Sequence, residues 1–224
     1  MYTFDDLIIE LEKYKNKDYE TFTKSLSGEV SLSYYGVKIP VLRRVVKKYD
    51  KKIDLSTFKP SYIYEVLFCY FALNILASKK YSEAFDFIKK NEKYWIGWGL
   101  TDSVYQYIKF PNDFSLVYPI LLSLKKYQNQ YIRRLAYLCC FKYENDVNNF
   151  KNIISLTQND SDYYVQMVES WLICDLYVKH TEETFMFLKE TKLDKIIVNK
   201  AISKIQDSFR ISEQDKKRAK SLRK

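Results

Sequence analysis

The chain has 224 residues, of which 47% are hydrophobic and 29% charged, and its net charge is +9. This composition excludes a disordered chain, and the lack of a run of 18 uncharged apolar residues predicts no membrane-spanning helix. The acidic first residues do not resemble a signal peptide, so we expect a cytoplasmic protein. The positive charge makes nucleic acid the leading candidate partner, ahead of an acidic membrane surface.

Apolar residues recur at helical spacing through most of the chain. Thr3 is placed to cap the first predicted helix, and Pro40 to start the second. The third is apolar on nearly every side, which predicts a buried helix. In chain order, the predicted helices cover residues 4–14, 41–52, 61–77, 82–90, 98–108, 115–127, 131–143, 148–156, 162–179, 182–191 and 194–206. A basic tail follows at about 216–224.

Three landmark residues are evenly spaced along these helices. Arg134 follows Trp98 by 36 residues, and Trp171 follows Arg134 by 37. This interval is slightly shorter than the ~40–47 residues of HEAT repeats. We therefore predict an all-α fold, a HEAT-like helical-repeat solenoid with a concave basic groove, built as one domain over residues 1–224.

The cysteines and the single histidine argue against metal and thiol chemistry. Cys69, Cys139, Cys140 and Cys174 form no CxxC pair, and we expect buried thiols in a reducing compartment. His180, the only histidine, is expected at a helix C-terminus, where a cation suits the helix dipole. The sequence thus predicts no metal site and no organic cofactor.

Two of the three tryptophans and two of the four glycines lie in residues 94–103. Trp98 and Asp102 are four residues apart and would share one helix face. An aromatic ring beside a carboxylate can hold a cationic ring and stabilise positive charge next to it. The alternative is a core tryptophan with a solvated or capping aspartate.

Two further clusters contain candidate DNA-contacting residues. Arg133 and Arg134 lie on the expected polar side of an apolar helix, where arginine can fork onto phosphate oxygens or simply be solvated. Trp171 lies three residues after the apolar Val168 and four before Asp175. It is either a core residue or one that faces a groove.

These clusters, in this order, resemble the DNA alkylation repair family of AlkD type. The similar motifs extend from about residue 30 to 210. They are Tyr35-Gly36-Val37-Lys38-Ile39-Pro40-Val41-Leu42-Arg43-Arg44, Trp98 with Asp102, Arg134-Leu135-Ala136, Gln166 with Trp171, and Ala201-Ile202-Ser203-Lys204-Ile205.

The resemblance implies a monomeric glycosylase that removes cationic N-alkylated purines, such as 3-methyladenine and 7-methylguanine, from double-stranded DNA. Asp102 would stabilise the developing sugar cation and orient water, and Trp98 and Trp171 would bracket the damaged nucleotide. The family is expected to hold the duplex in its groove without a base pocket. The residues expected to bind the DNA backbone are Arg134, Arg133, Arg43, Arg44, Lys38 and Lys200.

Three positions differ from the family's pattern. Gly99 and Cys174 stand where the family commonly has Asp and Arg, and Asn199-Lys200 replaces the Arg pair that the family has before its final Ala-Ile. These differences favour one alternative, a non-catalytic HEAT-like DNA-binding protein of the same family. A second alternative is a protein-binding helical scaffold, because solenoid grooves also bind peptides.

Overall fold

A computed structural model describes residues 1–27 and 31–224 of the chain. Within these residues the regular structure is helical, and the only β contacts are two isolated bridges, Tyr2 to Ile53 and Ser33 to Ile63. Within each part, helices pack against others that lie close to them in chain order, as α3 does against α4 and α7 against α8. The predicted all-α helical-repeat fold is therefore confirmed.

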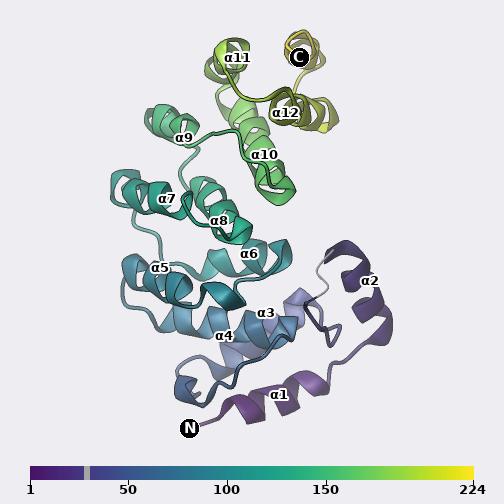
Figure 1. Ribbon diagram of the computed structural model, residues 1–224, viewed down its shortest axis with the longest axis vertical. Coiled ribbons are helices and arrows are strands. Elements are labelled where there is room, and N and C mark those ends of the chain that lie inside the picture. The colour runs from purple at the N-terminus through teal and green to yellow at the C-terminus, as the bar shows by residue number, and fades with distance from the viewer. Residues whose placement is uncertain (28–30) are drawn as a thin grey trace. The chain divides into compact units, whose positions relative to one another are not determined.

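The chain divides into two compact units, which we call unit 1 (Met1–Pro111) and unit 2 (Asn112–Lys224). Each unit has its own set of packed helices (Figure 1). The prediction of a single domain over 1–224, and that of a concave basic groove, stay predictions.

Unit 1 is built around one buried helix. Its helices are α1 (Phe4–Glu12), α2 (Lys17–Ser27), α3 (Ile39–Tyr49), α4 (Tyr64–Ala77), α5 (Tyr81–Lys90) and α6 (Trp98–Val104). Helix α4 packs against α3, α5 and α6, and its side chains are buried on nearly every side, as its apolar sequence predicts. The helix predicted over 98–108 is α-helical only to Val104 and continues as a 3-10 turn, Tyr105–Tyr107.

The start signals of the first two predicted helices are confirmed. The hydroxyl of Thr3 accepts a hydrogen bond from the backbone N–H of Asp6, whose carboxylate accepts one from the backbone of Thr3, which completes a capping box. Pro40 lies in the first turn of α3, where its missing N–H costs no helical hydrogen bond.

Helix α2 was not among the predicted helices, and it is fixed in place by a glycine. Gly36 has a positive φ of 74° and lies against the start of α2, where a Cβ atom would come within 2.1 Å of the carbonyl oxygen of Asn16. The backbone N–H of Asn16 donates to the carbonyl of Tyr35 at 3.0 Å. Only glycine permits both this conformation and this close approach.

Unit 2 is centred on α10. Its helices are α7 (Tyr118–Leu124), α8 (Gln130–Cys140), α9 (Phe150–Ser155), α10 (Tyr163–Lys179), α11 (Thr181–Glu190), α12 (Lys195–Asp207) and α13 (Glu213–Lys220). Helix α10 packs against α8, α11 and α12, and α7 packs against α8. The first residues of the predicted basic tail belong to α13, which packs against α12.

Two simpler expectations also have structural outcomes. All four cysteines are free and buried, as predicted. None of the helices in the described part of the chain is long and apolar enough to cross a membrane.

Candidate functional site

Helix α6 presents Trp98 and Asp102 together at the surface of unit 1. The helix begins after Gly97, whose positive φ of 83° turns the chain into the first turn. Trp98 and Asp102 lie one turn apart, and both are partly exposed. Trp95 is the core tryptophan of this segment instead: its ring is fully buried and meets Phe71 edge-on, with centroids 4.6 Å apart.

Arg43 lies beside the C-terminal end of α6. Its Nη2 donates to the Oε1 of Gln106 at 3.3 Å, and the Nε2 of Gln106 donates to the carbonyl of Asp102 at 3.4 Å. Arg44 and Lys38 are also exposed, and α3 buries Leu42 and other apolar residues on its opposite side. The structure therefore brings Arg43 of α3 close to the helix that carries Asp102.

A cavity of about 150 Å³ lies next to Trp98, within unit 1. Aromatic residues of α2, α4 and α6 line it, together with the buried carboxylate of Glu65. Sequence reasoning missed its α2 wall, although Tyr19, Phe22 and Leu26 recur there at helical intervals of three and four.

Arg133 and Arg134 are not on a solvated polar side of α8, because both are buried. Helix α8 is surrounded on all sides by protein, and its arginines reach acceptors from later in the chain. The Nη1 of Arg134 donates to the carbonyl of Tyr164 at 2.6 Å, at the start of α10. This arginine thus lies where α8 meets α10.

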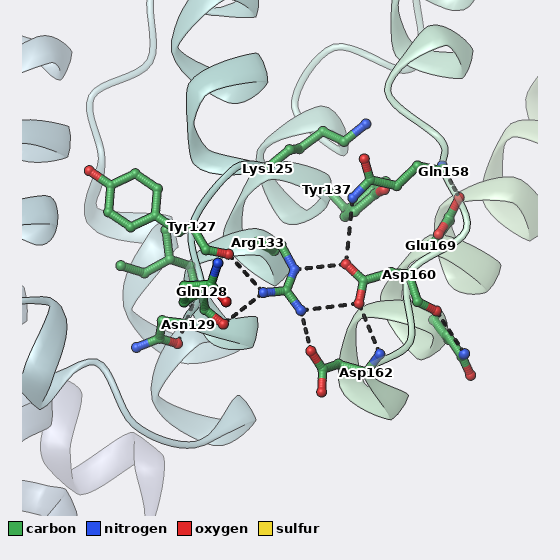
Figure 2. A network of polar contacts seen from close by, with 12 residues as sticks. Lys125, Tyr127, Gln128, Asn129, Arg133, Tyr137, Gln158, Asp160, Asp162 and Glu169 are labelled. Carbon is green, nitrogen blue, oxygen red and sulfur yellow. Dashed lines mark hydrogen bonds and ion pairs between the residues drawn. The ribbon is translucent and has the colours of Figure 1, made fainter.

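The guanidinium of Arg133 is fully used inside unit 2 (Figure 2). Its Nε and Nη2 donate to the two carboxylate oxygens of Asp160 at 2.7 and 3.1 Å, and Nη2 also contacts Asp162. Its Nη1 donates to the carbonyls of Tyr127 and Gln128 at 2.7 and 2.8 Å. An arginine has five N–H donors, so each one has an acceptor in this network.

The charge of Arg133 also fixes the ionisation of Asp160. Burial alone would raise the pKa of this carboxyl, but hydrogen bonds from Arg133 and from the backbone of Asp162 hold the pKa below its usual value. The predicted contact of Arg133 with DNA stays a prediction. The geometry supports a positioning role, in which Arg133 joins the connection before α10 to α8.

Trp171 is the exposed residue in an otherwise buried stretch of α10. The helix is buried at Val168 to Ser170 and again at Leu172 to Tyr177, whereas the Trp171 side chain is 42% exposed. Its ring rests on Phe141, with centroids 4.6 Å apart. Trp171 is therefore not a core residue, and its position in a groove stays a prediction.

An arginine lies close to Cys174 although the sequence has none at that position. Arg210, in the connection between α12 and α13, forms an ion pair with Asp175, which lies one turn after Trp171. Asp175 also contacts Lys179, whose ammonium group pairs with the buried Glu144. Burial, together with the neighbouring Asp175, raises the pKa of Glu144 to about 8.

Two aromatic residues lie beside basic side chains at the exposed edge of unit 2. The Lys200 ammonium group lies 4.8 Å from the ring centre of Tyr163, on the first turn of α10. Phe209, next to Arg210, is completely exposed. Sequence reasoning missed Phe209 and Arg210, because nothing in their spacing shows that the connection reaches Asp175.

Asn199 is engaged with the end of the chain, since its amide group exchanges two hydrogen bonds with the backbone of Lys224.

Over residues 1–27 and 31–224, no three His, Cys, Asp or Glu side chains are grouped so that they could hold a metal ion. The side chains that the site around α6 presents are a carboxylate (Asp102), an aromatic ring (Trp98) and a nearby cation (Arg43).

The fold and these surfaces define a helical-repeat protein with exposed aromatic and basic side chains on both of its units. The family model of the DNA alkylation repair enzymes matches residues 7–205, and the chain belongs to this family. Family membership gives it a role in the repair of alkylated DNA and an interaction with DNA. A search of curated proteins finds no match to the chain.

Proposed function

We propose that the protein is a DNA glycosylase that releases cationic N-alkylated purines, such as 3-methyladenine and 7-methylguanine, from duplex DNA. One observation carries the proposal beyond family membership: Trp98 and Asp102 lie one turn apart on α6, both accessible from solvent. A carboxylate beside an aromatic ring is suited to a reaction in which positive charge moves from a base to a sugar.

The reaction needs no protein acid. N-alkylation already places a positive charge on the purine, so the bond between its nitrogen and C1′ breaks with both electrons going to the base. The base leaves as a neutral molecule, and the sugar becomes an oxocarbenium-like cation, as in glycoside hydrolysis. Water then adds to C1′ and loses a proton, which gives an abasic site.

Asp102 has two tasks in this scheme. Its negative charge stabilises the sugar cation as the bond breaks, and its oxygen orients the attacking water and accepts the proton that the water loses. Trp98 supplies an aromatic face that favours the positively charged base. These roles need only residues of α6, so the chemistry is assigned to unit 1.

Basic residues of both units bind the phosphate backbone. In unit 1 these are Arg43, Arg44 and Lys38, which are exposed on or next to α3. In unit 2, Lys200 is assigned to DNA contact, with Trp171 as an exposed ring that packs against a nucleotide. We add Phe209 to this surface, because its ring contacts no other part of unit 2 and Arg210 lies beside it. Exposed rings among cations are typical of surfaces on which bases stack.

The test is the release of methylated purines from methylated duplex DNA. The wild-type protein should release them, and Asp102→Asn should lose at least about a hundredfold in rate, as expected when a positioned charge or base is removed. Asp86→Asn, an exposed aspartate on α5, is the matched control and should behave as wild type. Full excision by Asp102→Asn would remove the carboxylate from the mechanism.

The second candidate is a DNA-binding protein of this family without glycosylase activity. The observation that favours it is the set of changed positions: Gly99 carries no carboxylate, Cys174 is buried, and Asn199 is engaged with Lys224. Duplex binding without any base release by the wild-type protein would identify this function.

A further inference from the structure

The connection between α12 and α13 presents Arg210 to solvent from an anchored stretch of backbone. The backbone N–H of Arg210 donates to the hydroxyl of Ser208 at 3.3 Å, and the next residue, Ile211, is buried in the apolar core of α10 and α12. Phe209 and Arg210 lie between these two points, and both are exposed. Their backbone is therefore fixed before any ligand arrives.

The guanidinium of Arg210 reaches across to α10. Its Nη2 donates to the Oδ1 of Asp175. The arginine side chain is 57% exposed and that of Asp175 is 11% exposed, so the guanidinium covers the carboxylate on the solvent side. Residues 1–27 and 31–224 supply the guanidinium with this one acceptor, although an arginine has five N–H donors. Several donors on its exposed side are available to a ligand.

Asp175 is a fixed support for this arginine. Its Oδ2 lies 3.7 Å from the Nζ of Lys179, which in turn pairs with the buried Glu144. Burial alone would raise the pKa of Asp175, but hydrogen bonds from Glu144 and Arg210 hold the pKa below its ordinary value. The carboxylate is thus ionised at neutral pH, and its charge faces two cations and not the solvent.

Arg210 lies beside the exposed part of α10. Asp175 follows Trp171 by one helical turn, and the Trp171 ring is exposed. Burial raises the pKa of the Cys174 thiol, and the positive charge of Arg210 opposes this shift, which places the guanidinium near the same turn. An exposed ring and a forked cation side by side can contact a nucleotide and its phosphate together.

We propose that Arg210 binds a backbone phosphate of duplex DNA next to the nucleotide that Trp171 contacts, and that Asp175 is the positioning residue that orients the guanidinium. A guanidinium matches two phosphate oxygens with parallel N–H groups. Its prior orientation reduces the conformational entropy lost on binding. The inference rests on the proposed contact of unit 2 with duplex DNA and adds two residues to it.

The test is the affinity of the full-length protein for an undamaged labelled duplex, measured by fluorescence anisotropy over a series of salt concentrations. Arg210→Ala should weaken binding about tenfold at low salt, as expected for the loss of one charged contact. It should also lower the slope of log K against log salt by about 1. Arg210→Lys should keep the slope but bind more weakly than the wild type, because an ammonium group cannot fork. Unchanged affinity and slope in Arg210→Ala would overturn the proposal.

Asp175→Asn separates positioning from charge. Removal of a negative charge near DNA ordinarily strengthens binding. Loss of the support for Arg210 should instead weaken it, by at least about threefold, a usual size for coupling between residues in contact. In an Arg210→Ala background the same substitution should no longer weaken binding, because Asp175 acts through Arg210. Equal or tighter binding by Asp175→Asn alone would overturn the positioning role.

Arg218 is the matched control within unit 2. Its Nη1 and Nη2 donate to the two carboxylate oxygens of Glu182 at 2.6 and 2.9 Å, and its guanidinium lies 4.5 Å from the ring centre of Phe185. Because these partners occupy the guanidinium, Arg218→Ala and Glu182→Gln should keep nearly wild-type affinity and slope. An equal decrease in slope for Arg218→Ala would show that the measurement reports only total charge, which would overturn the assignment of Arg210. Thermal midpoints check that each variant is folded.

The two proposals fail in different ways, because this assay needs no base release. If the wild type releases no methylated base while the Arg210 and Asp175 variants bind as expected, the glycosylase proposal fails and the phosphate contact stands. If the wild type releases base and Arg210→Ala binds duplex as the wild type does, the contact fails and the glycosylase proposal stands.

Discussion

Arg133 and Asp160 form a bidentate ion pair, with N–O distances of 2.7 and 3.1 Å between the guanidinium and the carboxylate. Both side chains are shielded from solvent. The pair joins α8 to the connection before α10, across 27 residues of sequence. A buried pair of this geometry is costly to break from one side, because the remaining charge has no partner.

Arg133→Met should therefore lower the free energy of unfolding by about 3–5 kcal/mol, since it leaves the Asp160 carboxylate buried without its cation. Equilibrium unfolding in urea measures this change. Lys126→Met, an exposed position in the chain segment that follows α7, is the matched control and should change stability by less than about 0.5 kcal/mol. A similarly small effect of Arg133→Met would show that the network contributes little to stability.

Glu169 should make the protein less stable as the pH rises. Burial raises the pKa of this carboxyl to about 8, from its ordinary value of 4.5. The folded state therefore holds a proton that the unfolded state releases. The stability from this group is complete below about pH 4.5 and is lost as the pH rises through about 8, at up to ~1.4 kcal/mol per pH unit.

Glu169→Gln should flatten this dependence. The amide keeps an oxygen that can accept the 2.8 Å hydrogen bond from the backbone N–H of Gln158, and it has no proton to lose. Urea unfolding at pH 5.5 and 8.5 should show a smaller decrease for the variant than for the wild type. Glu144, whose pKa is also about 8, keeps its own share of the decrease in both proteins. An unchanged pH dependence would contradict the assignment.

Gly36→Ala should destabilise unit 1. A Cβ atom would come within 2.1 Å of the Asn16 carbonyl, and the positive φ alone costs an L-residue roughly 1–2 kcal/mol. Thermal unfolding should show a clearly lower midpoint, and limited proteolysis should cut more readily around α2. Gly99→Ala is the contrasting variant: its Cβ has room within a helix, so it should leave the thermal midpoint unchanged or raise it. Equal midpoints for Gly36→Ala and wild type would refute the requirement for glycine.

Phe209 and Lys200 should contribute to DNA binding in different ways. Phe209→Ala should lower duplex affinity at every salt concentration, because ring stacking does not displace counterions. Lys200→Ala should lower the slope of log K against log salt by about 1, the value for one phosphate contact. Filter binding over a salt series separates the two. Since the Phe209 ring is fully exposed, its loss should leave the thermal midpoint unchanged. If Phe209→Ala bound duplex DNA as tightly as the wild type, the Phe209 ring would not be part of the DNA-binding surface.

Helix positions were largely predictable from the sequence, because apolar spacing directly reflects which side of a helix is buried. Helix α4 and the Thr3 cap follow from their residues alone. Helix α2 was missed because its apolar residues are few, and they line a cavity instead of a packed core. Helix α13 was missed because most of its residues are charged. Its buried residue is Ala219, which alone gives no apolar pattern.

The site was only partly predictable, because its partners lie far apart in sequence. The spacing of Trp98 and Asp102 placed them on one helix face, and this needed no tertiary information. The burial of Arg133 depends on Asp160, and the ion pair of Arg210 depends on Asp175, 35 residues away. Contacts of this range are set by packing of the helices, which the local pattern of residues does not encode.

Because Trp95 is buried in unit 1 and Trp171 is exposed in unit 2, tryptophan fluorescence can report on each unit. In a Trp98→Phe variant, Trp95 would emit as an indole shielded from water in unit 1, and Trp171 as a hydrated indole in unit 2. Variants that keep a single tryptophan, either Trp95 or Trp171, would report the unfolding of each unit separately. Coincident transitions would define one cooperative domain, and separate transitions would define two.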